Sequence, residues 1–263
     1  MAKTVEVQRD PVSGKRMPIK GHLVELRDRI AKCVIALVIT VAISFIFTDN
    51  ILAILLEPKG DVVLQAIEPM ENIAIWFKVA LASGVILAMP YLVYQIISFI
   101  APGLTSKEKK LIYRLLPFIT ILFLAGVAFA YFVALPPALY FMGHFMSNIA
   151  ENTWRVSSYI NIITRMLVAI GCVFETPLIV MLLARMGLVS PQWLANKRKL
   201  WFVLAFAVSA LITPTMDPIN QTIIAVPLII LLELSIILAR MVYKKRDEPA
   251  AAQSAKASQP AQV

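Results

Sequence analysis

The sequence has few of the residues that disulfides, metal sites and hydrolytic catalysis require. Its 263 residues include two cysteines and two histidines. Cys33 and Cys172 fall at the start of one apolar segment and inside another, so neither is placed for a disulfide and no metal-ligand spacing is present. His22 and His144 lie outside the apolar centres, which therefore hold no serine–histidine pair or zinc cluster. The composition argues against an enzyme, including an intramembrane hydrolase, and against a metal or other cofactor.

Two further features are missing. Residues 1–30 are basic and contain no early apolar core, so they do not form a cleavable signal peptide. No internal repeat is visible along the chain, and this disfavours the transporter folds that are built from repeats.

Long apolar runs dominate the chain instead. Hydrophobic residues make up 59% of it, and its mean hydropathy is +0.78. A helix needs roughly 20 apolar residues to cross a bilayer core of about 30 Å. The sequence predicts an all-α integral membrane protein with six transmembrane helices, of which the fifth and sixth are short. The predicted spans are Val34–Phe47, Ile75–Ile100, Tyr113–Leu135, Ile160–Ala184, Leu200–Ile212 and Thr222–Ala239.

Basic residues gather in alternate connections between these spans. Most of the 25 lysines and arginines lie in residues 1–32, 102–114, 185–199 and 240–263. Because connections rich in Lys and Arg stay on the cytoplasmic side, both termini are expected in the cytoplasm. This topology accounts for the net charge of +9 and requires no nucleic-acid partner.

The chain is expected to form one membrane domain over residues 21–245. A mobile cytoplasmic extension, residues 1–20, precedes it. The tail, residues 246–263, is rich in Ala, Gln, Ser and Pro, a composition typical of disorder. Two prolines are expected to have structural roles: Pro58 interrupts the first external connection, and Pro177 lies inside the fourth span, where it would kink the helix.

Two carboxylates lie on the basic cytoplasmic side. Glu25 precedes the first span, where a negative charge does not help insertion, so a cationic ligand is its favoured partner. Glu108 lies among three lysines in the first cytoplasmic connection. For Glu108, a solvated charge or a capping-box contact with Thr105 is an equally supported interpretation.

Three polar residues fall at or near membrane depth. Glu175 lies about midway along the fourth span, where an acidic side chain costs about 2.5–3.5 kcal/mol on insertion scales. Either it bonds to a neighbouring helix in its neutral form, or it forms a polar site for a proton, a substrate or a partner helix. Asp217 and Gln221 mark the short connection between the last two spans, where they either cap a turn or line a hydrated site.

These residues belong to a series of short motifs that occur in a fixed order. The segments concerned are 22–27, 94–95, 99–104, 107–110, 126–132, 174–177 and 211–214, followed by Asp217 and Gln221. Together they resemble the TatC family, the membrane receptor of the twin-arginine protein export pathway. The resemblance covers about residues 18–245 with the same six-span topology, and the joint occurrence of the motifs is specific.

The resemblance implies a concave, glove-like helical structure in a bacterial inner membrane. It implies that the paired arginines of a signal peptide bind at the cytoplasmic face, through the glutamates that match Glu25 and Glu108. Arg27 belongs to the first of these motifs, Phe99 matches the aromatic before the loop, and Glu175 matches the family's intramembrane glutamate. It also implies a multi-copy complex with the single-span partners TatA and TatB, which exports folded proteins by means of the proton-motive force.

A proton-coupled transporter of small solutes is the alternative, with Glu175 as the proton carrier. The absence of an internal repeat and the presence of the cytoplasmic glutamates argue against it.

Overall fold

The computed structural model describes residues 19–60, 62–100, 106–145, 153–215 and 217–243. Within these ranges, the side chains of residues 19–20, 22, 106–113 and 115 fall outside the description. The predicted tail and nearly all of the predicted amino-terminal extension lie outside the described residues.

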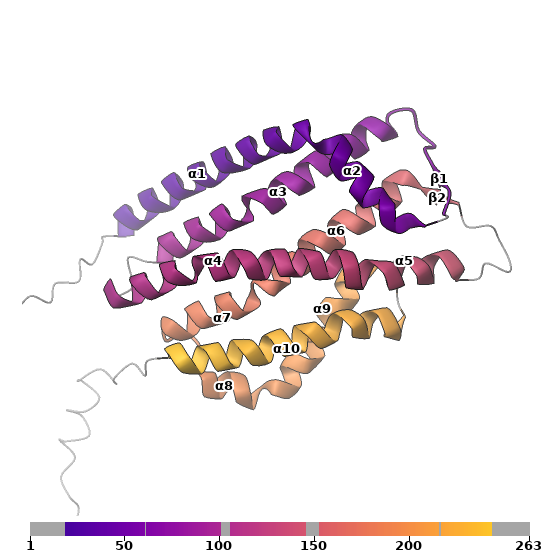
Figure 1. The fold of residues 1–263 in the computed structure, drawn as a ribbon. Helices are drawn as coiled ribbons and strands as arrows, with labels where there is room; N and C mark the ends of the chain where they lie inside the picture. Colours follow the sequence, from indigo (N-terminus) through magenta and orange to yellow (C-terminus); the bar gives the residue numbers. More distant parts are fainter. Residues whose placement is uncertain (1–18, 61, 101–105, 146–152, 216, 244–263) are drawn as a thin grey trace, which may run out of the picture.

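The described elements are almost all helical (Figure 1). In chain order they are α1 (Ile19–Ile46), α2 (Thr48–Leu56), the 3₁₀ turn η1 (Glu57–Lys59), β1 (Leu64–Gln65), α3 (Glu71–Ile100), α4 (Ser106–Phe129), the π-helical turn η3 (Ala130–Ala134), α5 (Leu135–His144), β2 (Trp154–Arg155), α6 (Val156–Phe174), α7 (Thr176–Arg185), α8 (Pro191–Asn196), α9 (Arg198–Ile212) and α10 (Pro218–Val242).

Five helical segments of the described residues are long and apolar enough to cross a membrane. They are Leu23–Ile46, Glu71–Ile100, Leu116–His144, Val156–Arg185 and Pro218–Val242. These segments match predicted spans one to four and span six, and the all-α integral membrane class is confirmed. The fifth predicted span is α9, whose 15 residues extend about 22 Å at the helical rise of 1.5 Å per residue. It is short, as predicted, and less than the thickness of a typical bilayer core.

The prediction of a short sixth helix is wrong. Helix α10 has 25 residues, because Asp217 caps its first turn and Arg240 remains helical in its last turn. The apolar segment Thr222–Ala239 marks only the middle of this helix. Hydropathy measures the length of apolar sequence, and a helix can continue beyond that length wherever its polar ends find partners.

The helices are packed as neighbours in an open arrangement. Helix α1 packs on α3, α3 and α4 pack on α6, and α10 packs on α7 and α9. Figure 1 shows α1 and α3 along one flank, α9 and α10 along the other, and α4 with α6 between them. Only 6% of the apolar window of α1 is buried, so most of that helix faces outward. This separation of the flanks agrees with the glove-like arrangement expected from the resemblance.

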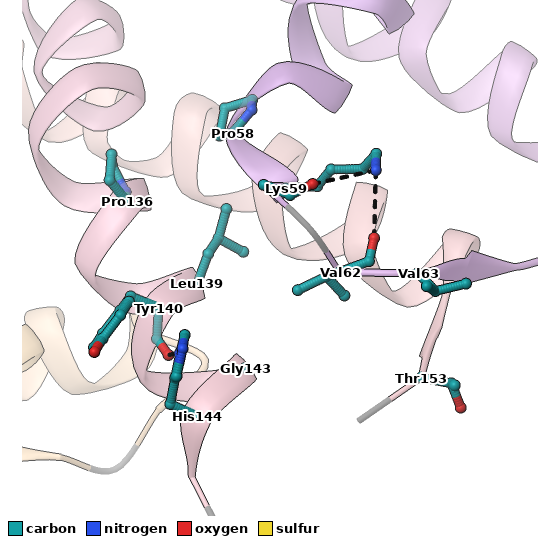
Figure 2. A pocket seen from close by; sticks show the side chains of 11 residues that line it. Pro58, Lys59, Val62, Val63, Pro136, Leu139, Tyr140, Gly143, His144 and Thr153 are labelled. Carbon is teal, nitrogen blue, oxygen red and sulfur yellow. Dashed lines mark hydrogen bonds between the residues drawn. The ribbon is translucent and has the colours of Figure 1, made fainter. Parts of the chain in front are cut away.

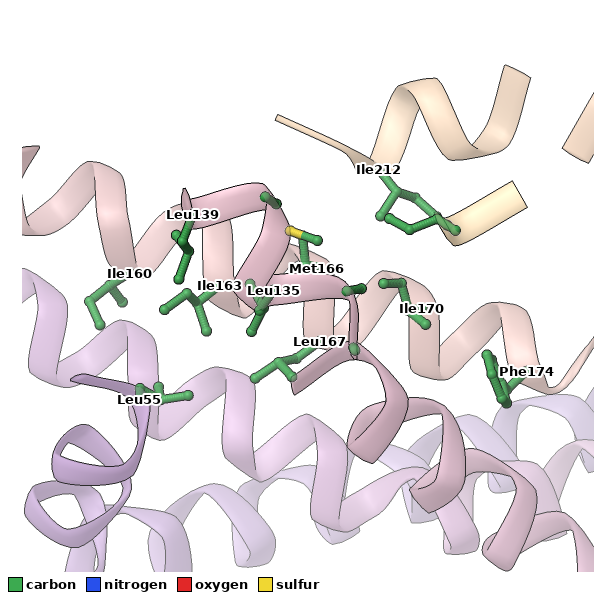
Figure 3. Close-up of a cluster of buried hydrophobic side chains, with 14 of the residues drawn as sticks. Leu55, Leu135, Leu139, Ile160, Ile163, Met166, Leu167, Ile170, Phe174 and Ile212 are labelled. Carbon is green, nitrogen blue, oxygen red and sulfur yellow. The ribbon is translucent and has the colours of Figure 1, made fainter. Parts of the chain in front are cut away.

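The main hydrophobic core surrounds α6 (Figure 3). Ile160, Ile163 and Met166 of α6 are fully buried and meet side chains from α2 and α5, including Leu55 and Leu135. These residues recur along α6 at helical spacing, so one continuous apolar stripe faces the neighbouring helices.

A cap of non-helical segments closes one end of the molecule. Strands β1 and β2 pair in parallel, with Leu64 opposite Trp154 and Gln65 opposite Arg155. The hydroxyl of Tyr159 donates to the carbonyl of Leu55 at 2.9 Å and fastens α6 to α2 below the cap. The two predicted external connections therefore form one unit.

Helices α1 and α3 approach each other closely at Gly84. A Cβ atom at this position would lie 2.5 Å from Cγ2 and 2.7 Å from Cα of Val41. The second contact is with backbone, so a larger residue requires the whole helix α1 to move.

We expect Gly84→Ala to lower the free energy of unfolding by about 1–3 kcal/mol, the usual cost of overpacking. Thermal unfolding in detergent measures the change. Gly143→Ala is the matched control, since its Cβ would meet atoms only at 3.6 Å and beyond, and it should leave stability unchanged or slightly raised. Equal losses in the two variants would contradict the close crossing.

Candidate functional site

Glu25 lies in a polar contact between α1 and α3. Its carboxylate accepts two hydrogen bonds from the guanidinium of Arg29, one turn further along α1, with the Nε bond at 3.1 Å. The third guanidinium nitrogen of Arg29, Nη1, donates to Oε1 of Gln95 at 3.3 Å. Gln95 is only 4% exposed on α3, and the Glu25 side chain is 19% exposed. The three residues thus join the ends of two neighbouring helices.

Two members of this contact were missed by sequence reasoning. The spacing of Glu25 and Arg29 by four residues is the helical spacing at which opposite charges meet, so Arg29 could have been found. Gln95 belongs to the segment 94–95 that carries the resemblance, but its part in this contact was not predicted. Its partner comes from the packing of α1 on α3, which no local pattern specifies.

The other residues predicted for this site take different positions. Arg27 is exposed and pairs with its neighbour Asp28 at 2.8 Å. Phe99 is half-buried in the last turn of α3, one turn beyond Gln95 and on the same face. Glu108 lies in the first turns of α4, and its side chain falls outside the described part of the structure.

Glu175 lies at the break between α6 and α7. It follows the last residue of α6 and precedes Thr176, and its carbonyl accepts the first N–H bonds of α7. Its side chain is 4% exposed, and Oε2 has no hydrogen-bond partner among the described residues. Pro177 lies in the first turn of α7, where a missing N–H removes no helical hydrogen bond. A buried carboxylate oxygen without a donor marks this break as a polar site.

Asp217 and Gln221 serve local structure at the start of α10. Asp217 caps the helix, since its Oδ2 accepts from the backbone N–H of Asn220 at 2.8 Å and its Oδ1 from the side-chain amide at 3.0 Å. Burial raises the pKa of Asp217, but its hydrogen bonds, including those from Asn220, outweigh burial and hold the pKa below its usual value. Gln221 donates to the carbonyl of Phe206 at 3.0 Å and so fastens α10 to α9.

A third buried carboxylate, that of Glu71, was not singled out from the sequence. It is 3% exposed and accepts from the N–H groups of Ile67 at 2.9 Å and Ser157 at 2.8 Å. Arg155 donates to it at 3.3 Å and also pairs with Glu68. Glu71 therefore connects the two external connections beside β1 and β2. In the sequence it is one of several acidic residues in its loop, and nothing local distinguishes it.

Pro58 lies at a cavity of about 560 Å³ between η1 and α5 (Figure 2). Lys59 donates to the carbonyls of Gly60 and Val62 at 3.3 and 3.4 Å, so its charge serves its own loop. His144 lies against the carbonyl of Tyr140 at 2.9 Å. The described residues contain no group of three or more His, Cys, Asp or Glu side chains that could hold a metal ion.

Comparison with known proteins gives one consistent family. Residues 21–227 match the model of the TatC family, the Sec-independent protein translocase proteins. TatC of Aquifex aeolicus is 37% identical over 238 residues, which cover 88% of this chain and 98% of that protein. TatCd of Bacillus subtilis is 35% identical over 240 residues, covering 90% and 98%. A crystal structure of the twin-arginine translocase receptor TatC in DDM is 38% identical, has a TM-score of 0.74, and covers 83% of this chain and 99% of that one.

Removing the Glu71 carboxylate should loosen the external cap. Glu71→Ala leaves the partly buried backbone N–H groups of Ile67, Glu68 and Ser157 without this acceptor, and an N–H group that loses its partner costs free energy. We expect limited proteolysis at the external connections to become about tenfold faster or more, because local opening becomes easier. Glu68→Gln is the control: its side chain is 66% exposed, and loss of an exposed ion pair should change the rate little. Comparable proteolysis rates for wild type and Glu71→Ala would show that Glu71 does not hold the external connections together.

Removing the cap at Asp217 should destabilise α10. Asp217→Ala is expected to lower the free energy of unfolding by about 1 kcal/mol, while Asp217→Asn keeps an acceptor and loses less. Because the folded pKa of Asp217 is lowered, its ionised form contributes stability above the pKa of the unfolded chain. That contribution disappears as the pH falls through the folded pKa. Thermal unfolding measured as a function of pH should show this loss in wild type and not in Asp217→Asn.

Proposed function

Because the chain belongs to the TatC family of Sec-independent protein translocase proteins, we propose that it is the core receptor of a twin-arginine translocase in a bacterial cytoplasmic membrane. It binds twin-arginine signal peptides at the cytoplasmic face. With single-span partners of the TatA and TatB type, it exports folded proteins by means of the proton-motive force. Both termini lie in the cytoplasm, as the distribution of basic residues predicts.

The observation that supports this proposal most directly is the pairing of Glu25 with Arg29. A guanidinium already lies against this carboxylate in a partly buried position beside α3. The peptide's arginine takes the same kind of contact, since a planar fork of N–H donors matches a carboxylate. A lysine ammonium makes a less directional contact, so twin lysines bind more weakly.

The internal arginine also explains why one peptide arginine is not enough. If a peptide arginine displaces Arg29 from Glu25, one ion pair replaces another and little free energy is gained. The net gain comes from a second arginine at Glu108, which lies at the start of α4. Selectivity for paired arginines then follows from the need to occupy both carboxylates.

The apolar part of the signal peptide needs a nonpolar surface close to Glu25. Helix α1 provides one, because Ile30, Val34 and Val38 are spaced by four residues on one face and are each more than half exposed. Phe99 lies one turn beyond Gln95 and places an aromatic ring near the same helix ends. The peptide is proposed to follow this stripe into the membrane.

Single-span partners are proposed to bind near Glu175. An apolar groove of about 150 Å³ lies beside it between the α6–α7 break, α9 and α10. Val173 and Thr176 line one side and Trp201, Leu204 and Leu232 the other. A partner helix with a polar residue could supply the donor that Glu175 Oε2 lacks among the described residues. The membership in a protein translocase family favours this role over small-solute transport.

The proposal is tested by binding of a fluorescent twin-arginine signal peptide to the full chain in nanodiscs. We expect Glu25→Gln and Glu108→Gln each to weaken binding about tenfold or more, because each removes a charge-assisted contact. A peptide with twin lysines should bind wild type more weakly than the twin-arginine peptide.

Asp28→Asn is the matched control, since it changes an exposed carboxylate next to the same site. Its binding should equal that of wild type. Full binding by the Glu25→Gln, Glu108→Gln double variant would refute the two-carboxylate site.

A further inference from the structure

Apart from Arg114, the second residue of the third predicted span, two cations lie inside the predicted membrane spans. Lys78 is seven residues beyond the first residue of α3, and Arg165 is nine residues beyond the first residue of α6. At 1.5 Å per residue, they lie about 10 and 14 Å along their helices. Charged side chains at such depth are costly and generally face a partner or a hydrated surface. Both cations therefore require an explanation.

The two cations belong to one surface formed by α3 and α6. Lys78 Nζ donates to Oδ1 of Asn161 at 2.5 Å, which joins the two helices. Arg165 lies one turn beyond Asn161 on α6, so the side chains of Arg165 and Asn161 point to the same side. Both of these residues are exposed. In the described part of the chain, neither Lys78 nor Arg165 forms an ion pair, and Arg165 has no hydrogen-bond partner.

The side-chain groups of this surface are chiefly hydrogen-bond donors. Oδ1 of Asn161 already accepts from Lys78, and the NH₂ group of Asn161 remains to donate outward. Lys78 and Arg165 carry only donors. The complementary ligand is therefore an anion that only accepts hydrogen bonds, and a carboxylate fits both the amide and the guanidinium fork.

We propose that Lys78, Asn161 and Arg165 form a membrane-embedded docking site for a transmembrane helix that carries a carboxylate at the level of these cations, about 10–14 Å beyond the first residues of α3 and α6. A phospholipid phosphate stays at the level of the head groups, whereas a helix can hold Asp or Glu at this depth. The carboxylate and the two cations each reduce the cost of the other's burial.

This site is separate from the other two. Glu175 is ten residues further along the same helical segment, about 15 Å from Arg165. Glu25 lies at the opposite end of α3, beside Gln95. The inference therefore does not rest on the signal-peptide site, and each can fail without the other.

The test uses the full chain in nanodiscs of a zwitterionic lipid and a synthetic single-span helix of Leu and Ala. The helix carries one Glu at about 12 Å from the end of its apolar segment, and its matched control carries Gln at that position. Binding is measured by energy transfer between dyes on the two partners. We expect wild type to bind the Glu helix about tenfold more tightly than the Gln helix, as charge-assisted bonds predict.

Variants of the chain identify which residues produce the preference for the Glu helix. Arg165→Gln and Lys78→Gln should each reduce the preference for Glu, and the double variant should abolish it. Lys199→Gln, which removes an exposed cation at the start of α9, should keep the full preference. Arg165→Glu should reverse the preference, so that a helix with Lys binds more tightly than the Glu helix.

Three results would overturn the proposal: equal affinity of wild type for the Glu and Gln helices, an unchanged preference in the double variant, or loss of the preference when anionic phospholipid is added. The last would assign the surface to lipid phosphate. Thermal unfolding confirms that the variants are folded, and twin-arginine peptide binding gives an independent measure of the cytoplasmic site.

Discussion

The cost of a polar group in hydrocarbon is the constraint on which this structure depends. It confines the backbone within the membrane to helices, because every N–H and carbonyl must be satisfied within the segment. It also determines where carboxylates lie. Glu71 has four donors, the backbone N–H groups of Ile67, Glu68 and Ser157 and the side chain of Arg155, and Glu25 has Arg29. At Glu175 and Arg165 such compensation is incomplete among the described residues, and this is why a partner is proposed for each.

The helical fold could be predicted from the sequence because the cost just described acts on local composition. Long apolar runs located five of the described spans and the short α9. The length of α10 could not be predicted, because it depends on a cap and on a polar last turn. Strands β1 and β2 have two residues each and pair across a long separation in sequence. Two residues are too few to show a periodic pattern, so the pairing of β1 with β2 at the external end could not be predicted from the sequence.

The candidate sites show the same difference between local sequence properties, which could be predicted, and contacts between distant elements, which could not. Glu25 was recognised because its charge opposes that of the surrounding segment, which is a local property. Its contact with Gln95 depends on how α1 crosses α3, which sequence spacing does not contain. Glu71 shows the opposite case: one acidic residue among several became the most extensively hydrogen-bonded carboxylate described, because two distant loops meet around it. Residues that act across elements are the ones that single-sequence reasoning misses.

The close approach at Gly84 has a mechanical consequence. Helix α1 packs along α3, and three contacts mark this packing: the junction with α2 beyond Ile46, the Gly84 crossing, and the contact of Arg29 with Gln95. A ligand that draws Arg29 away from α3 releases only the last of these. The amino-terminal part of α1 then loses its polar contact with α3, while the Gly84 crossing and the junction with α2 remain in place. Occupancy of Glu25 is thereby linked to how firmly this part of α1 lies against α3.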